Sequence, residues 1–491
     1  MLVIKNKYLE FIIIILTGAL YTFSFAPIDF KIGIFISLIL FLYILSNSSK
    51  KASIYKSFLY GIAVFASGVS WIFNSVYYHG GEDIFISSII TFSFILFLSI
   101  FFIPLGYFIN KENDMSRSYM PIIVASIWVL LEFIRSHIFT GFPWLLVGTS
   151  QTGTFFDSLY PIFGTYIISF FVVMISMMVT VFILSKSKIF LSKLYFLFVI
   201  FLFILINFFP IYTTDSQKSI KMTVIQPNIH LGIKFNEREL NSIKRKYLQI
   251  LDNKIHSLVV LPETAIPEIY QLDKTFYEKL RINKNINIIA GVFNYNHQVD
   301  EVYNSILILN DNETFYNKRH LVPFGEYTPF ESIFGIIGKV LNIPMSNLGS
   351  GDFNQKDIKY ENVTLHTLIC YEIAYPYLIK TNDDYGVIIN VSNDAWFGDS
   401  FAPYQHLQIA QTRALESSRP VIRAANTGIS AVIDKNGNIL NQIQLNDEGY
   451  INAEIYPSRG ITPYMYFGDY PLLMIIFSIM LLYWKYNKKY G

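Results

Sequence analysis

The stretch Thr364–Tyr375, TLHTLICYEIAY, decides how the second half of this chain is organised. It contains Cys370, the only cysteine among 491 residues, so the chain cannot form an internal disulfide. Cys370 lies where the apolar, β-rich residues 363–369 stop and the polar pair Tyr371-Glu372 begins. In α/β folds such strand ends present side chains to a ligand crevice. A lone cysteine can also be a buried, inert core residue, so the neighbouring residues must decide between the two interpretations.

The composition indicates an integral membrane protein. Hydrophobic residues make up 53% of the chain and charged residues 15%, and the mean hydropathy is +0.40, which is too apolar for an ordinary soluble protein. The net charge is only +2, and the sequence contains no basic run with interleaved aromatic residues. We therefore expect no nucleic-acid partner. The sequence also lacks phosphate-binding glycine fingerprints and the spacing of metal ligands.

Eight apolar stretches have about the length needed to cross a hydrocarbon core about 30 Å thick, which takes about 20 helical residues. They lie near 8–27, 31–47, 56–78, 84–109, 119–138, 161–184, 189–209 and 470–486. The first resembles a signal peptide, but no small-residue cleavage site follows it, and we expect it to be retained. The predicted organisation is a bundle of about seven spans at 1–210, a water-facing domain at 211–469, and a C-terminal span with its tail at 470–491.

Basic residues beside these stretches predict the orientation in the membrane. Thirteen Lys and Arg lie in loops on one side, whereas the opposite loops 28–30, 79–83 and 139–160 contain none. The thirteen are Lys5, Lys7, Lys50, Lys51, Lys56, Lys111, Arg117, Lys186, Lys188, Lys193, Lys485, Lys488 and Lys489. Both termini are therefore expected in the cytoplasm, and 211–469 in the periplasm of a bacterium, with the chain in the inner membrane. An unpaired thiol in that oxidising compartment needs a reason.

Segment 210–469 is predicted to be an α/β domain, because strand-like and helix-like stretches alternate. Short runs rich in Val and Ile, bounded by Asn, Pro, Gly and Asp, predict strands. They are 222–226, 258–261, 286–292, 305–309, 363–370, 387–391 and 429–433. The amphipathic stretches 237–254 and 405–418 predict helices, and Asn436-Gly437 predicts a hairpin turn. We expect a mixed sheet covered by helices.

Three strand ends in this domain carry reactive side chains: Glu263, Lys318 and Cys370. A thiol with a pKa near 8.5 is only a few per cent ionised at pH 7, so a nucleophilic cysteine needs a base or a positive field beside it. A glutamate can take the proton, and a lysine can stabilise both the thiolate and an oxyanion. Taken singly, Glu263 and Lys318 are as easily explained as surface charges, and spacing alone leaves the choice open.

Four segments of this domain resemble the nitrilase superfamily and, within it, the membrane-embedded branch of the apolipoprotein N-acyltransferases. They are LPETAIPE at 261–268, YNKRHLVPFGEYTP at 316–329, ICYEIAYP at 369–376 and SNDAWFG at 392–398. In the membrane part, GVSWIFNSVYYHGG at 68–81 and EFIRSHIFTGFPWLLVGTSQ at 132–151 resemble the same branch. The resemblance implies an α-β-β-α nitrilase sandwich for the periplasmic domain.

The resemblance also implies roles for individual residues. Glu263 would be the base, Lys318 the oxyanion stabiliser and Cys370 the nucleophile. Supporting or substrate-binding roles fall to Glu326, Tyr371, Glu372, Phe235 and Trp396. Glu326, Tyr371 and Glu372 each have a simpler, purely structural alternative. Glu326 could only orient Lys318, for example, and Glu372 could only anchor its loop by accepting backbone hydrogen bonds. Phe235 stands where the family carries a tryptophan, so an aromatic contact is kept there and an indole hydrogen bond is lost.

The implied reaction is an acyl transfer in two halves. Cys370 would attack the sn-1 ester of a phospholipid, expected to be phosphatidylethanolamine, and release a lysophospholipid. The α-amine of the diacylglyceryl-cysteine of an apolipoprotein would then take the acyl chain as an amide. The expected partners are thus the phospholipid donor, the diacylated apolipoprotein and the membrane. No metal or organic cofactor is required, and we expect a monomer.

Two other functions remain open from the sequence. A membrane-tethered nitrilase-type amidase or hydrolase would share Glu263, Lys318 and Cys370 but admit water to the acyl-enzyme. A transporter or structural membrane protein is the second, and Glu132 and Arg135 inside the spans are the kind of residues that would support it. We interpret Glu132 and Arg135 instead as a pair near the periplasmic edge.

Apolar residues also crowd segment 330–345, although it belongs to the water-facing domain. One interpretation is an ordinary buried helix. The other is an apolar arm that dips into the outer leaflet and guides a lipid ester towards Cys370, as interfacial helices do.

Overall fold

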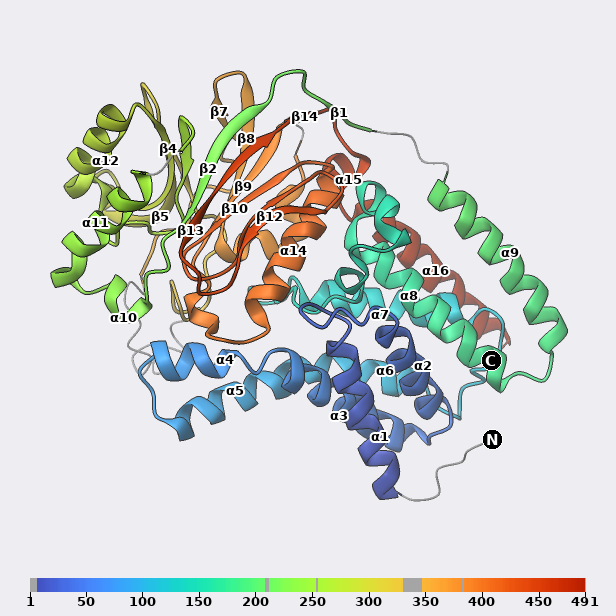
Figure 1. Cartoon of the computed structure of the whole chain (residues 1–491). Coiled ribbons are helices and arrows are strands. Elements are labelled where there is room, and N and C mark those ends of the chain that lie inside the picture. The colour runs from blue at the N-terminus through green and yellow to red at the C-terminus, as the bar shows by residue number, and fades with distance from the viewer. Residues whose placement is uncertain (1–6, 208–211, 253–254, 330–346, 382–383, 491) are drawn as a thin grey trace. The chain divides into compact units, whose positions relative to one another are not determined.

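The computed structural model describes residues 7–207, 212–252, 255–329, 347–381 and 384–490 (Figure 1). The chain divides into two compact units. The first comprises Met1–Phe73, Phe85–Pro210 and Phe467–Gly491, and the second comprises Asn74–Ile84 and Ile211–Tyr466. The segment 330–345, for which an apolar arm is one hypothesis, lies outside the described residues.

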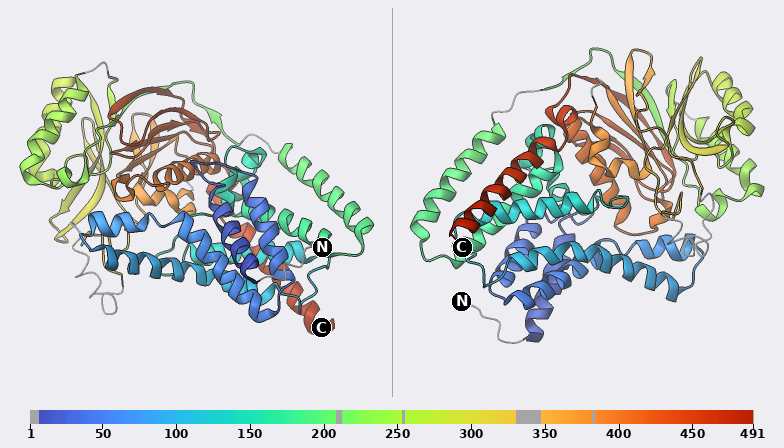
Figure 2. Two further views of the ribbon diagram at one scale, coloured as in Figure 1. Left: turned by 60° about the horizontal axis from the view of Figure 1, so that its bottom comes forward. Right: turned by 180° about the vertical axis from the view of Figure 1, so that it is seen from behind.

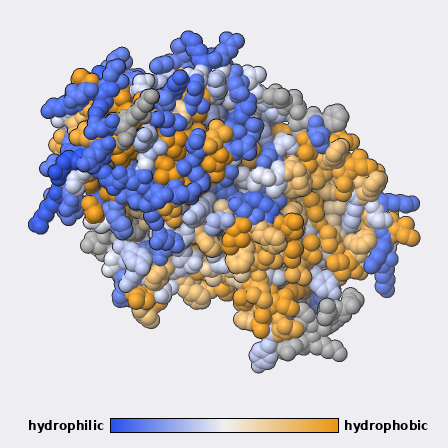
Figure 3. Space-filling view, in the orientation of Figure 1, coloured by the Kyte–Doolittle hydropathy of each residue, from blue (hydrophilic) through white to orange (hydrophobic). Residues whose placement is uncertain are grey.

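The first unit is helical, and a helix occupies each of the eight apolar stretches. These helices are α1 (Lys7–Thr22), α2 (Gly33–Ser46), α3 (Lys50–Gly68), α5 (Ile84–Ser99) continued by α6 (Ile103–Phe108), α7 (Met120–Arg135), α8 (Tyr160–Leu184), α9 (Lys188–Asn207) and α16 (Tyr470–Tyr490). Figure 3 shows hydrophobic side chains gathered on the surface of this unit. An apolar exterior of this kind is what a lipid-facing helix bundle requires.

Fewer helices than the eight predicted spans are long and apolar enough to cross a membrane. Within the described ranges three pass by length and composition, Ile84–Phe108, Phe155–Leu184 and Lys188–Asn207, and a fourth passes if α3 and Ile72–Tyr78, bent by 58°, form one span. Helices α1 and α2 contain 16 and 14 residues, about 24 and 21 Å at 1.5 Å per residue. They are shorter than the apolar stretches because the chain turns between them.

Glu132 and Arg135, expected to pair with each other, instead hold the loop that follows α7. The carboxylate of Glu132 accepts hydrogen bonds from Trp128 Nε1 at 3.1 Å and from the Val147 main-chain N–H at 2.8 Å. Arg135 Nη1 donates to two main-chain carbonyls of the loop, at 2.7 Å each. No ion pair joins these two described side chains. The two side chains therefore form no direct ion pair, although the charge of Arg135 still acts on the Glu132 carboxylate.

The second unit contains two six-stranded sheets. One has the order β13-β2-β3-β4-β5-β6 and the other β12-β11-β10-β9-β8-β7. The strands of the first are β2 (Ile220–Gln226), β3 (Leu258–Val260), β4 (Asn287–Asn296), β5 (Glu301–Leu309), β6 (Glu313–Asn317) and β13 (Gly449–Ile455). Those of the second are β7 (Ile358–Tyr360), β8 (Val363–Ile369), β9 (Val387–Ser392), β10 (Val421–Ala425), β11 (Ser430–Ile433) and β12 (Ile439–Ile443).

The two sheets pack face to face and helices cover their outer faces. One buried cluster joins residues of both sheets, among them Val260, Ile306, Ile369 and Val391. A second joins the first sheet to helices α11 (Leu240–Leu251) and α12 (Tyr270–Lys284). Helix α14 (Ala402–Ser417) lies along the second sheet (Figures 1 and 2). This is the α-β-β-α sandwich that the resemblance implied.

The central strands are mostly apolar because both of their faces are covered. Every residue of β9 and β10 is buried, whereas burial alternates along the edge strand β13. All seven predicted strands are present, and the turn at Asn436-Gly437 joins the antiparallel β11 and β12 as predicted. Strands β10 and β13 and helix α12 were not predicted. The residue patterns alone predicted one mixed sheet, whereas the resemblance implied two sheets, and two six-stranded sheets are present.

Candidate active site

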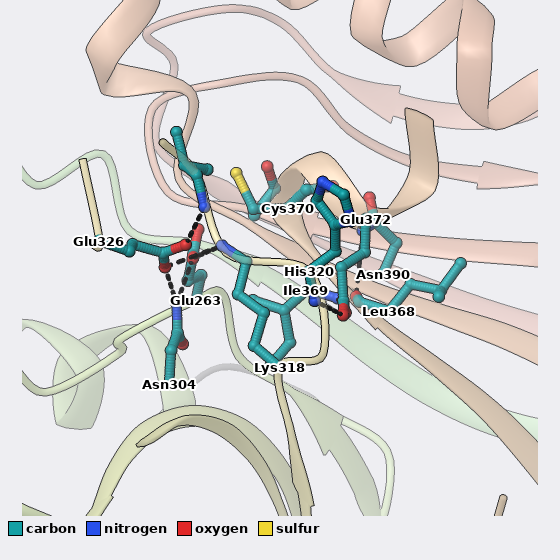
Figure 4. A network of polar contacts seen from close by, with 12 residues as sticks. Glu263, Asn304, Lys318, His320, Glu326, Leu368, Ile369, Cys370, Glu372 and Asn390 are labelled. Carbon is teal, nitrogen blue, oxygen red and sulfur yellow. Dashed lines mark hydrogen bonds and ion pairs between the residues drawn. The ribbon is translucent and has the colours of Figure 1, made fainter. Parts of the chain in front are cut away.

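Glu263, Lys318 and Cys370 each follow a strand and come together in the second unit. Glu263 lies three residues beyond β3, Lys318 directly after β6, and Cys370 directly after β8. Their residues are 6%, 0% and 7% exposed. Lys318 Nζ lies 3.6 Å from Glu263 Oε1, and charges on both side chains act on the Cys370 thiol. Figure 4 shows the side chains with the polar groups that surround them.

Cys370 has a left-handed backbone, with φ of 50°. That conformation costs a non-glycine residue roughly 1–2 kcal/mol, and buried polar groups around the Cys370 carbonyl hold it. His406 Nε2 lies 3.2 Å from this oxygen, and Asn390 Nδ2 donates to it at 3.5 Å. A carbonyl can only accept, so Nε2 of His406 carries the proton. The backbone turn that presents the sulfur is therefore set by side chains of β9 and α14.

A fully buried network of charged side chains contacts His406. Arg423 Nη2 lies 2.6 Å from Asp394 Oδ2 and 3.0 Å from His406 Nδ1. Arg423 Nη1 also donates to Asn390 Oδ1. Burial would raise the pKa of Asp394, but Arg423 and the other partners outweigh it and hold that pKa well below 3.8. Asp394 is thus ionised at neutral pH and balances the guanidinium.

Lys318 is held between two carboxylates. Its Nζ lies 2.8 Å from Glu326 Oε1, nearer than the 3.6 Å to Glu263 Oε1. Asn304 Nδ2 donates to both Glu263 Oε1 and Glu326 Oε1, at 2.8 Å each. The Val322 main-chain N–H donates to the other oxygen of Glu326 at 2.8 Å. Glu326 therefore orients Lys318 in this structure, which leaves the carboxylate of Glu263 only partly neutralised.

The electrostatics of the site explain why these groups act together. Burial raises the pKa of the Cys370 thiol to about 12, the negative Glu263 adds to the rise, and Lys318 opposes it. Burial would lower the pKa of Lys318, but Glu326 and Glu263 outweigh burial and raise it. The resting thiol is therefore protonated and the lysine charged at neutral pH. Nucleophilic attack requires that a base remove the thiol proton as the new bond forms.

Glu372 ties the loops of Lys318 and Cys370 together. Its Oε2 accepts the Ile369 main-chain N–H at 2.8 Å, and its Oε1 accepts those of Arg319 and His320 at 2.7 and 3.1 Å. The hydroxyl of Tyr316 lies 3.0 Å from both oxygens. Burial raises the pKa of Glu372, and these donors together with Arg319 oppose the rise. Such contacts are those of a loop anchor.

The remaining residues with expected supporting roles lie at different depths. Tyr371 is buried, 8% exposed, and its ring packs edge-on against Tyr375 at 5.0 Å. Phe235 is half-buried at the end of α10 (Leu231–Lys234). Trp396 is half-buried in the short helix Asp394–Phe397, and its carbonyl accepts a hydrogen bond from Ser75 Oγ at 2.8 Å. No role for Phe235 or Trp396 follows from these contacts alone.

Three residues of the site were not found from the sequence: Asn304, His406 and Lys234. Asn304 lies inside β5 and His406 inside α14, where each reads as an ordinary polar residue of a regular element. Lys234 directly precedes Phe235, and its Nζ donates to the Glu263 carbonyl at 2.9 Å. The position of Lys234 next to Phe235 was the one signal in the sequence that could have identified it. Among the described residues no group of three or more His, Cys, Asp or Glu side chains is suited to hold a metal ion.

Comparison with known proteins assigns the family. The profile of the apolipoprotein N-acyltransferase N-terminal domain matches residues 17–178, and that of the carbon-nitrogen hydrolases matches 223–461. An apolipoprotein N-acyltransferase of Haemophilus influenzae is 33% identical over 500 residues, covering 97% of this chain and 95% of the relative. The chain belongs to the apolipoprotein N-acyltransferase family. A relative of that name from Coxiella burnetii is 32% identical and covers 96% of this chain and 99% of its own.

Both parts of an apolipoprotein N-acyltransferase are thus present in one chain. The carbon-nitrogen hydrolase match begins within β2 and extends past β13, so it includes Glu263, Lys318 and Cys370 and the strands that they follow. Among solved structures, a CN-hydrolase superfamily protein of Xanthomonas campestris covers 49% of this chain and 91% of its own, with a TM-score of 0.38 and 17% identity.

Proposed function

We propose that this protein transfers an acyl chain from a phospholipid to the α-amine of the diacylglyceryl-cysteine of apolipoproteins, the last step of lipoprotein maturation. The observation that carries the proposal is the meeting of Glu263, Lys318 and Cys370 in a member of the apolipoprotein N-acyltransferase family. We propose the sn-1 chain as the one transferred and phosphatidylethanolamine as the donor.

In the first half of the reaction Cys370 becomes acylated. Its sulfur attacks the ester carbonyl while Glu263 takes the thiol proton, and the ammonium of Lys318 stabilises the oxyanion of the tetrahedral intermediate. When the intermediate collapses, the C–O bond breaks and Glu263 returns the proton to the departing lysophospholipid. The enzyme then carries a thioester and the base is regenerated. The 2.8 Å contact between Lys318 and Glu326 supports this assignment, because it keeps Glu263 available as the base.

In the second half the apolipoprotein amine takes the acyl group. The neutral amine attacks the thioester carbonyl, Lys318 again stabilises the oxyanion, and Glu263 accepts a proton from the nitrogen. The C–S bond breaks, the proton passes to the sulfur, and the product amide leaves. Because one nucleophile serves both halves, we expect ping-pong kinetics. The two bulky lipids need not occupy the site together.

We further propose the membrane arrangement that the basic residues predict. The catalytic domain, 211–469, would lie in the periplasm, with about seven spans at 1–210, one span at 470–491, both termini in the cytoplasm and a monomeric chain in the inner membrane. A reporter fused after Lys218 should then be active only in the periplasm, and one fused after Lys188 only in the cytoplasm. The opposite pattern would overturn the orientation and with it the access to apolipoproteins.

Mass spectrometry of the intact protein tests the acyl-enzyme. With phosphatidylethanolamine alone, we expect one acyl group per chain on Cys370, removed by neutral hydroxylamine, and about one equivalent of lysophospholipid. A diacylated lipopeptide with a free amino terminus should discharge the thioester into an amide. The same peptide acetylated at its terminus is the matched control and should leave the thioester in place.

Two results would contradict the transferase assignment. One is N-acylation of the peptide by Cys370→Ala. The other is release of labelled acyl groups chiefly as free fatty acid in the presence of the free-amine peptide, which would support the hydrolase instead. Cys370→Ser should abolish turnover, because with the same base an alkoxide is far harder to form than a thiolate.

A further inference from the structure

A second lysine is buried beside the proposed catalytic residues and has no part in the reaction as written above. Lys234 closes the short helix α10 and is 1% exposed. An ammonium group has three N–H donors, yet the one hydrogen bond that the structure gives this group is to the main-chain oxygen of Glu263, at 2.9 Å. Within the described residues no carboxylate forms an ion pair with it. A buried charge without an ion-pair partner is costly and needs an explanation.

The contact with Glu263 falls at a strained turn. Thr264 follows Glu263 and has a left-handed backbone with φ of 49°. Lys234 thus holds the carbonyl of the peptide that joins these two residues. On the other side of the turn, Gly291 N–H donates to the Pro262 carbonyl at 3.1 Å. The position of the Glu263 side chain depends on this turn, so Lys234 helps to place it.

The charge of Lys234 also reaches the nucleophile. Burial lowers the pKa of Lys234 to about 8, and Glu263 and Cys370 are the two groups whose negative charges oppose that fall. Interaction between two charges is mutual, so a thiolate that stabilises the ammonium is stabilised by it. Lys318 also acts on the thiol and lowers its pKa, but its charge is shared with Glu326 at 2.8 Å, whereas Lys234 has no such carboxylate partner among the described residues.

We propose that Lys234 is a positioning residue that supplies a second positive charge to the site: its ammonium group holds the Glu263 carbonyl and stabilises negative charge on the Cys370 sulfur. The assignment rests on the proposed function in so far as Cys370 is the nucleophile and Glu263 its base. The ammonium group of Lys234 is a buried, preorganised cation, and the negative charge that it stabilises develops only when the thiol ionises or attacks.

Alkylation of the thiol tests this directly, because Cys370 is the only cysteine in the chain. The full-length protein in detergent is treated with iodoacetamide at a series of pH values, and the rate is followed by mass spectrometry. Near pH 6.5, Lys234→Met should be alkylated at least tenfold more slowly than the wild type, the change that one unit in the thiol pKa produces. Above about pH 9, where Lys234 itself has lost its proton, the two rates should converge.

Three other charged or titratable groups near the thiol, Lys318, Asp394 and His406, do not titrate between pH 6.5 and 9. The pKa of Lys318 is raised, and those of Asp394 and His406 are lowered below 3.8 and 6.5. A bend in the wild-type profile near pH 8 is therefore assigned to Lys234. Lys234→Arg, which stays charged, should be alkylated near the wild-type rate at pH 6.5 and should remain fast above pH 9.

Lys221→Met is the matched control, because Lys221 is an exposed lysine on β2 whose side chain is 59% exposed, and its profile should follow the wild type. Equal alkylation rates for Lys234→Met and wild type at every pH would overturn the proposal. If Lys234→Met does not fold, the wild type alone still tests the proposal. The absence of a bend near pH 8 in its alkylation rate would overturn the proposal. Alkylation needs neither phospholipid nor apolipoprotein, so a failed acyl-transfer assay would leave this result standing.

Discussion

Replacing Glu372 by glutamine tests whether this residue anchors the catalytic loops or acts on substrate. Its two oxygens accept three main-chain N–H groups, from Ile369, Arg319 and His320. Glutamine has the same shape but only one oxygen. In either orientation of the amide, an NH₂ group faces at least one main-chain N–H, and that hydrogen bond is lost.

The size of the effect follows from the number of bonds lost. A hydrogen bond to a charged acceptor contributes about 1.5–3 kcal/mol, so the loss of one should lower the free energy of unfolding by that amount. For a domain of roughly 150–250 residues, 1 kcal/mol corresponds to about 2–4 °C in Tm. Glu372→Gln should therefore unfold about 3–12 °C below the wild type.

Activity should fall together with stability. Arg319 and His320 follow Lys318 directly, and Ile369 precedes Cys370, so a loosened anchor lets the lysine and the sulfur drift apart. A misplacement of about 1 Å can cost up to about 100-fold in rate. The assay pairs thermal unfolding of the detergent-solubilised protein with the rate of lysophospholipid release in a single turnover.

Glu237→Gln provides the control, because Glu237 is an exposed residue of the same domain, and surface substitutions usually change stability by less than about 0.5 kcal/mol. An unchanged Tm for Glu372→Gln would refute the anchoring argument. A normal Tm with strongly reduced turnover would instead point to direct contact between Glu372 and the substrate.

Glu326→Gln should slow thioester formation by about tenfold or more. Lys318 would lose its partner at 2.8 Å and shift towards Glu263, 3.6 Å away, and this shift would neutralise the base. Single-turnover release of lysophospholipid measures the rate, and an unchanged rate would refute the prediction. Asp394→Asn should lose less folding stability than the wild type as the pH falls below about 4. The pKa of Asp394 is held below 3.8, chiefly by Arg423 against the effect of burial, so its contribution is fully present above about pH 4 and is lost as the pH falls through the folded-state value. Unfolding midpoints measured between pH 5 and 2 check it, and identical acid limbs for variant and wild type would contradict it.

Much of the fold and of the candidate site could be predicted because the signals are local. An apolar run followed by a polar residue marks a strand end whatever the rest of the chain does. Glu263, Lys318 and Cys370 were placed at strand ends in this way, whereas their roles were implied only by the resemblance. The hairpin at Asn436-Gly437 likewise depends on two residues and their neighbours. The apolar stretches were located correctly, but α1 and α2 are shorter than predicted, because hydropathy does not register the turn between them.

The order of residues along the chain shows which side chains lie at the ends of strands, but only the folded protein shows which strands are neighbours. Alternation along a strand sets the face on which a residue lies, whereas the order of strands depends on packing between residues far apart in the chain. Asn304, on β5, contacts Glu263, which follows β3, because β4 pairs with both of these strands. His406 reaches the Cys370 carbonyl from α14, and Lys234 reaches that of Glu263 from α10. The residues that make these contacts are 36 and 29 positions apart in the chain, so no local sequence pattern predicts them.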